Sequence, residues 1–352
     1  MRFTPLRLIL LLAAALFPFL AQGELVWTPE TGWKVEGDVL APLAAPEARN
    51  ALDLMNKARE AEERGSNRRA LRAYRKVYKN YAKSVYASEA YFRTAQIRMA
   101  QKRYKKAFEA LQQIVFFYPN YEKFDQVIGQ QYRIATLLAE GARGRILWIF
   151  PGFKNRSRSI TYYEQVVANA PFSDYAPLAL MNVARIHHRL GDDDSAIFAL
   201  DRIINSYWES VLTPDAYLRL ANTHASLVDG PLYDQASTKE AITFYEDYMI
   251  LFPGDPNISE AEKGLADMKT VLAQSKLKIG DFYYNKRNNL TAAKVFYNEA
   301  ITTYPDSEVS AKAREKLDII DARLAAAPKA PDGQPSGNPP PAPKKRKWYW
   351  PF

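Results

Sequence analysis

One pattern with fixed internal spacing recurs six times along the 352-residue chain. Each copy begins with a small residue and continues with Tyr or Leu four positions later, a mostly apolar residue at seven, and an aromatic or small residue at eleven, usually followed by Pro. Offsets of 0, 4, 7 and 11 share one face of an α-helix, so each copy predicts an amphipathic helix that ends near the Pro. The six small residues are Ala70, Ala107, Ser159, Ala196, Ala241 and Ala293.

The spacing between the copies predicts pairs of helices. The positions after the offset-eleven residues are 82, 119, 171, 208, 253 and 305, which fits a 37-residue unit with insertions of 15, 8 and 15 residues. A second alanine lies thirteen residues beyond four of these positions, inside another periodic segment: Ala95, Ala184, Ala221 and Ala266. We therefore predict an all-α fold, a right-handed solenoid of about six helix-turn-helix repeats. In the fourth repeat, Gly191 predicts the turn and Asp192 can cap the next helix.

The ends of the chain differ from its body. Arg2 and Arg7 precede an apolar run from Leu8 to Leu20, which at about 13 residues is shorter than the ~20 needed to span a bilayer. Residues 1–23 therefore predict a secretory signal peptide, the alternative being an uncleaved anchor, and cleavage after Gly23 stays open. We expect an extended segment over 24–45, the solenoid over 46–326 with an insertion at 141–158, and a Pro-rich disordered tail over 327–352.

The net charge of +9 is concentrated in a few segments of the chain. The signal contributes +2 and the tail +4, which leaves +3 for the body; the insertion alone holds +5, so the remainder carries −2. A general nucleic-acid-binding surface is not predicted. The chain has no Cys and three His and lacks the common catalytic motifs, so we predict no enzyme activity, catalytic residue, cofactor or metal site.

The histidines and the acidic run after Gly191 have structural explanations. His187 and His224 stand 37 residues apart at the same repeat position, which predicts packing between helices. His188 points about 100° away from His187 on a helix, so the two cannot form a compact metal site. Asp192-Asp193-Asp194 predicts a helix start stabilised by the helix dipole, in preference to a calcium site.

Two basic and aromatic elements are candidate contacts with a partner or an anionic membrane. The insertion "ARGRILWIFPGFKNRSR" places Trp148 and Phe150 among cations that include Arg156, although the aromatic residues could instead fold back onto the solenoid. The tail could act as an interfacial tether or stay solvated. Its end carries Lys344, Lys345, Arg346, Lys347, Trp348, Trp350 and Phe352.

These residues resemble tetratricopeptide repeats over roughly 46–326, and more narrowly the BamD family of outer-membrane assembly factors. The narrower resemblance rests on Tyr118-Pro119, on "APFSDYAPLALMNVA", and on a long helix ending in Tyr283 and Tyr284 before a repeat closed by Tyr304 to Ser307. Family members are normally lipoproteins, and this sequence has no cysteine to acylate.

The resemblance implies an exported, non-catalytic scaffold, in the periplasm and peripherally associated with the outer membrane. Its partners would be a β-barrel insertase and unfolded outer-membrane β-barrel proteins. From helix phase, the candidates facing the binding groove are Arg59, Gln96, Met99, Arg185 and His188.

The alternative is a CpoB-like periplasmic adaptor that links the outer membrane to peptidoglycan synthesis. The long helix ending in Tyr283 and Tyr284 favours the BamD resemblance, whereas an N-terminal coiled coil would favour CpoB, and residues 24–45 show no heptads. A peptidoglycan-cleaving enzyme built on a helical superhelix is a third class, but the repeats leave no room for an added catalytic domain.

Overall fold

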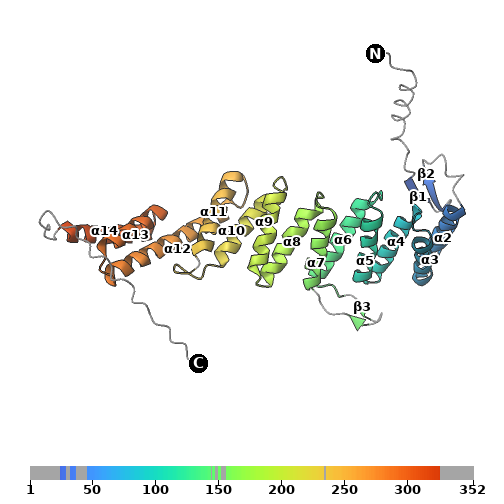
Figure 1. Ribbon diagram of the computed structural model, residues 1–352, viewed down its shortest axis with the longest axis horizontal. Helices are drawn as coiled ribbons and strands as arrows, with labels where there is room; N and C mark the ends of the chain where they lie inside the picture. Colours follow the sequence, from blue (N-terminus) through green and yellow to red (C-terminus); the bar gives the residue numbers. More distant parts are fainter. Residues whose placement is uncertain are drawn as a thin grey trace, which may run out of the picture. The chain divides into compact units, whose positions relative to one another are not determined.

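The structure is a computed structural model that describes residues 24–28, 32–36, 46–143, 145–146, 150–151, 156–233 and 235–325. Over these residues the chain forms thirteen helices and two small antiparallel hairpins (Figure 1). The strands are β1 (Glu24–Thr28), β2 (Gly32–Glu36), β3 (Arg145–Ile146) and β4 (Phe150–Pro151). The helices are α2 (Pro46–Glu63), α3 (Asn67–Asn80), α4 (Tyr86–Ala100), α5 (Tyr104–Phe117), α6 (Phe124–Ala139), α7 (Arg156–Asn169), α8 (Tyr175–Arg189), α9 (Asp193–Ser206), α10 (Thr213–Ser226), α11 (Gln235–Leu251), α12 (Ile258–Asn285), α13 (Leu290–Thr303) and α14 (Glu308–Ala325).

The six copies of the sequence pattern form the second helices of successive pairs, namely α3, α5, α7, α9, α11 and α13. At the offsets 0, 4 and 7, every one of these side chains is at most 3% exposed. In the first helices, Ala95, Ala184 and Ala221 are also at most 3% exposed, which allows close approach of neighbouring helices, whereas the fourth predicted alanine, Ala266 on α12, is only half-buried. The predicted all-α repeat fold is confirmed.

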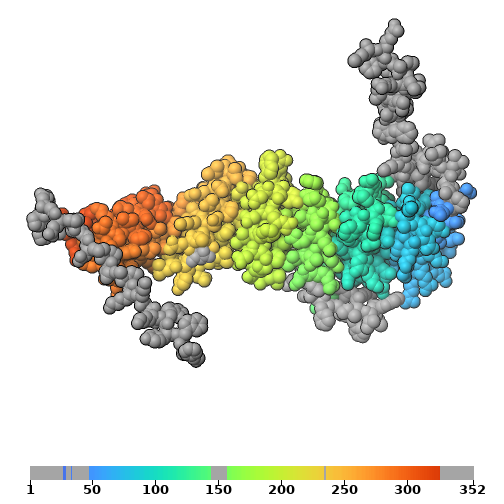
Figure 2. Space-filling view, viewed as in Figure 1, coloured from blue at the N-terminus to red at the C-terminus, as the bar shows by residue number. Residues whose placement is uncertain are grey.

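The chain divides into two compact units. Unit 1 contains the residues up to Leu227 together with Thr243–Ala261, and unit 2 contains Val228–Ile242 and the residues from Glu262 onward. In unit 1, α2 to α9 lie side by side in chain order, and successive repeats form successive bands of colour (Figures 1 and 2). Each repeat therefore contacts mainly its neighbours, as in other helical-repeat arrays. The core of unit 2 includes Tyr297 and Ile320, which are fully buried between α13 and α14.

Local signals set the ends of several helices. Gly191 has φ of +74°, which a residue without Cβ adopts readily, and Asp192 caps α9 by accepting a hydrogen bond from the Ser195 amide at 3.2 Å. The predicted turn and cap are confirmed. The 28-residue α12 ends at Asn285, just after Tyr283 and Tyr284, as expected for the long helix that ends in paired tyrosines.

The N-terminal hairpin was not predicted, because residues 24–45 were expected only to be extended. β1 and β2 pair antiparallel, with Trp27 opposite Trp33. Trp33 is 1% exposed, and its backbone N–H donates to Oδ1 of Asn56 on α2 at 2.9 Å. The two tryptophans form a cross-strand pair, and burial of Trp33 gives the hairpin a hydrophobic attachment to the first repeat.

Candidate partner-binding surface

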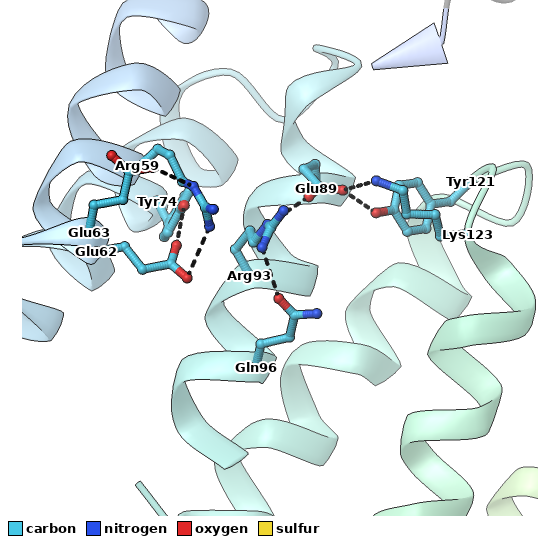
Figure 3. A network of polar contacts seen from close by, with 9 residues as sticks. All are labelled: Arg59, Glu62, Glu63, Tyr74, Glu89, Arg93, Gln96, Tyr121 and Lys123. Atoms are coloured by element: carbon cyan, nitrogen blue, oxygen red, sulfur yellow. Dashed lines mark hydrogen bonds and ion pairs between the residues drawn. The ribbon is translucent and has the colours of Figure 1, made fainter. Parts of the chain in front are cut away.

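A buried carboxylate links the first helix of the second repeat to the next turn (Figure 3). Glu89 on α4 is 1% exposed and ion-pairs with Nε of Arg93 at 2.9 Å and with Nζ of Lys123 at 3.2 Å. It also accepts a hydrogen bond from the hydroxyl of Tyr121. Burial next to the Glu89 carboxylate raises the pKa of the Tyr121 phenol. A charge this deeply buried needs such partners, so the cluster is structural.

Arg59 and Gln96, two of the predicted groove residues, make contacts within the protein. The Arg59 guanidinium lies 3.4 Å from Glu62 and 3.3 Å from Glu63, and it sits 4.2 Å from the centre of the Trp27 ring. Gln96 accepts a hydrogen bond from Arg93 at 3.3 Å. The hairpin, through Trp27, therefore contacts the predicted groove residue of the first repeat.

The other three predicted groove residues differ in exposure. Met99 is half-buried and packs against the core of unit 1. Arg185 and His188 on α8 are exposed, and His188 Nδ1 lies 2.6 Å from Asp193 Oδ1. Arg185 and His188 are therefore more exposed to solvent than Arg59, Gln96 and Met99. His224 stacks on Phe244 with ring centres 5.5 Å apart, which confirms its predicted packing role.

Further polar side chains lie on α8, near Arg185, and on α10, the first helix of the next repeat. Asn182 donates a hydrogen bond to the hydroxyl of Tyr132 at 2.9 Å. Arg219 and Asn222 stand 37 residues after Asn182 and Arg185, at the equivalent positions of the next repeat. We call Asn182, Arg185 and His188 on α8, together with Arg219 and Asn222 on α10, the polar strip. The 37-residue period could have revealed Arg219 and Asn222 in the sequence.

An apolar groove adjoins the polar strip. It has a volume of about 890 Å³ and is formed by the connection between α7 and α8, the first turn of α8, and the connection between α9 and α10. Phe172 is 100% exposed, Val211 92% and Trp208 68%. Leu178, which also lines the groove, lies one helical turn before Asn182 on α8. Large apolar side chains gathered in the open mark a binding surface.

The apolar groove was not predicted from the sequence. Phe172 lies inside the quoted segment "APFSDYAPLALMNVA", and Trp208 stands where four of the other five repeats carry Pro. The groove could have been predicted from Trp208, because a bulky aromatic residue is unusual at the position that follows the end of each second helix.

The predicted membrane contacts fall mainly outside the described residues. Trp148 and the tail residues Lys344, Lys345, Arg346, Lys347, Trp348, Trp350 and Phe352 are not described. The backbone of Phe150 lies in β4 and that of Arg156 begins α7. These contacts stay predictions. Within the described ranges, no helix combines the length and apolar character needed to cross a membrane, and no group of three or more His, Asp or Glu residues could hold a metal ion.

Comparisons with known proteins agree with this architecture. Residues 55–122 match the tetratricopeptide repeat profile, and residues 153–324 match a family described as outer membrane lipoprotein. Fold and sequence together define a tetratricopeptide-repeat protein.

Curated relatives narrow this class further. The outer membrane protein assembly factor BamD of Xylella fastidiosa (strain 9a5c) is 23% identical over 155 residues, which is 41% of this chain and 53% of the relative. BamD of Pasteurella multocida (strain Pm70) is 25% identical over 197 residues, which is 51% of this chain and 75% of the relative. The chain is a BamD-like tetratricopeptide-repeat protein, and it spans about half the length of the Xylella relatives.

Similarity to solved structures is more distant. A tetratricopeptide repeat protein from Parabacteroides merdae is 12% identical, with a TM-score of 0.30, over 78% of this chain and 99% of that one. PilW, a type IV pilus biogenesis factor, is 16% identical, with a TM-score of 0.26, over 77% of this chain and 100% of that one.

Proposed function

We propose that this protein is a non-catalytic periplasmic adaptor that assists the assembly of outer-membrane β-barrel proteins; its BamD relatives are named outer membrane protein assembly factors. The observation that carries the proposal is the apolar groove, because its residues from Pro171 to Leu212 lie within the segment 153–324 that matches the outer membrane lipoprotein family. The curated relatives named as outer membrane protein assembly factors point the same way.

The groove and the polar strip suit an unfolded client chain. Phe172, Trp208 and Val211 offer apolar area for a client's aromatic or aliphatic side chains. Arg185 and Arg219 are exposed on α8 and α10, and although Arg219 Nε also ion-pairs with Asp215 at 2.8 Å, the remaining N–H groups of both can donate hydrogen bonds to the client's backbone carbonyls. Many modest contacts of this kind bind extended or helical peptides without requiring one sequence.

The proposed location is the periplasm, in peripheral contact with the outer membrane. The basic and aromatic residues of the insertion, Trp148, Phe150 and Arg156, and the tail from Lys344 to Phe352 are the candidate contacts with an anionic surface. Co-sedimentation with anionic vesicles, for the full chain and for a truncation ending at residue 343, tests the tail: equal sedimentation of the two would remove it from the proposal.

The function is tested by identifying what the tagged protein co-purifies with from solubilised outer membranes. Recovery of a β-barrel insertase and its client proteins supports the proposal. Recovery of peptidoglycan synthases or Pal-like proteins without an insertase would replace it with the CpoB-like alternative.

A further inference from the structure

A second groove, in the N-terminal repeats of unit 1, is almost entirely cationic. It has a volume of about 600 Å³ and lies between α3 and the turn that joins α4 to α5. No carboxylate is among its lining residues. Five arginines line it together with Leu71 and Gln101: Arg68, Arg72, Arg75, Arg98 and Arg103. We call it the arginine groove.

The α3 wall is cationic from end to end. This helix has six Lys or Arg residues among its fourteen and no Asp or Glu. Arg68, Arg72 and Arg75 are spaced at i, i+4 and i+7, so they form one stripe along the helix. Like charges at this spacing destabilise a helix, and an anion bound along the stripe would remove that cost.

The opposite wall of the arginine groove, at the end of α4 and in the turn to α5, is also positively charged. Arg98 is half-buried near the end of α4 and donates a hydrogen bond to Oε1 of Gln101 at 3.4 Å. Burial and the nearby charge of Arg103 lower the pKa of the Arg98 guanidinium. Guanidinium groups from two elements thus face one opening, and a counter-charge placed there would stabilise the charge of Arg98.

Several arginines of unit 1 outside the arginine groove have a carboxylate partner. Arg59, Arg93 and Arg202 each ion-pair with a glutamate. Within the described part of the chain, no carboxylate ion-pairs with Arg72, Arg75 or Arg98. The carboxylate partner that Arg59, Arg93 and Arg202 have is missing for these three arginines, of which Arg72 and Arg75 are exposed and Arg98 is half-buried.

We propose that the arginine groove binds phosphate groups. A guanidinium presents its N–H donors as a planar fork that matches the oxygens of a phosphate. A phosphate has oxygens directed to several sides, so guanidinium groups on both walls can share one group, whereas a carboxylate presents two oxygens at a single edge. The phosphate can come from a lipid headgroup or from a free phosphate compound, and both present the same chemistry.

Titration calorimetry on the full chain tests this site with two probes, inorganic pyrophosphate and vesicles of phosphatidylglycerol, with phosphatidylcholine vesicles as the reference. The groove variant is R72Q/R75Q/R98Q, and the matched control is K239Q/K263Q/K312Q, which removes the same charge at three exposed lysines elsewhere. Gln has a helix propensity close to that of Arg, so both variants should fold, and the melting temperature of the groove variant should equal or exceed that of the wild type.

The expected result is that the groove variant binds at least one probe about tenfold more weakly, while the control changes by less than about twofold. Loss confined to vesicles identifies a lipid headgroup as the source, and loss confined to pyrophosphate identifies a free phosphate. The proposal is overturned if groove and control variants bind both probes equally, or if polyglutamate binds the groove as tightly as the phosphate probes.

Discussion

Tyr121 donates its phenolic hydrogen to Glu89, a carboxylate that is only 1% exposed although it belongs to a helix of an open repeat array. The two residues are 32 positions apart, so the contact fixes the connection after α5 against α4. With Arg93 and Lys123, they complete a polar cluster between neighbouring repeats. In a repeat protein, stability depends on such contacts between neighbours.

Removing this carboxylate should destabilise unit 1. E89A leaves Arg93 and Lys123 without their shared counter-ion, and we expect a loss of about 2 kcal/mol in the free energy of unfolding, below the usual cost of breaking a fully buried pair because both cations keep some solvent contact. E89Q should lose less, since its amide oxygen still accepts hydrogen bonds. Urea unfolding followed by circular dichroism measures both.

Glu109 supplies the matched control for Glu89. Its carboxylate lies 3.7 Å from Lys105, and both side chains are more than half exposed. E109A should change the free energy of unfolding by less than about 0.5 kcal/mol. An equal effect of E89A and E109A would contradict the structural role of the buried cluster.

Replacing either of two helical glycines with alanine should change stability in opposite directions. A Cβ on Gly280 would lie 2.6 Å from the ring of Tyr297, which is fully buried and held by a 2.7 Å hydrogen bond to Asp281. We expect G280A to destabilise unit 2 by about 1–3 kcal/mol through overpacking. In G129A the close atoms are the hydroxyl of half-buried Tyr175, at 2.7 Å, and the ring carbon Cζ that carries it, at 3.1 Å, so a small shift at the far end of this side chain makes room. That variant should be neutral or up to about 1 kcal/mol more stable. Equal melting temperatures for the two variants would contradict the packing of α12 on α13.

Alkaline pH should weaken the repeats through their buried tyrosines. Burial raises the pKa of Tyr163 from its ordinary value of 10.0 to about 12. Burial beside a glutamate also raises the pKa of Tyr74 and of Tyr121. The folded state then holds these protons more tightly than the unfolded state, so their contribution is complete below about pH 10 and declines as the pH rises toward the folded pKa.

The measurement is the melting temperature across this range, with tyrosinate absorbance recorded in parallel. In Y163F, which lacks the phenolic proton, the decline between about pH 10 and pH 12 should be smaller than in the wild type. An unchanged melting temperature up to about pH 12 would contradict the burial of these phenols.

The sequence predicted what depends on local periodicity. Ala70, Tyr74 and Val77 have equivalents in every second helix, and their spacing alone identifies the buried face. Asp192 was recognisable as a cap because capping involves only the next few residues.

Contacts between residues far apart in the sequence could not be predicted from local periodicity. A glutamate such as Glu89 is normally exposed, and its burial depends on Lys123, 34 positions away. Trp33 is buried through a contact 23 positions distant. The arginine groove could not be recognised from the net charge. The body outside the insertion carries −2 in total, although α3 has no acidic residue, so a sum over the body hides this local positive charge.

The most direct test of the proposed adaptor function is the Kd for a urea-unfolded outer-membrane β-barrel protein. F172S/W208S removes the two exposed aromatic residues of the apolar groove, and F116S/F117S, at residues 70% and 67% exposed on α5, is the matched control. We predict unchanged melting temperatures for both variants, binding at least about tenfold weaker for F172S/W208S, and less than about twofold change for the control. Wild-type affinity in F172S/W208S would contradict the assignment of the apolar groove as the client-binding site.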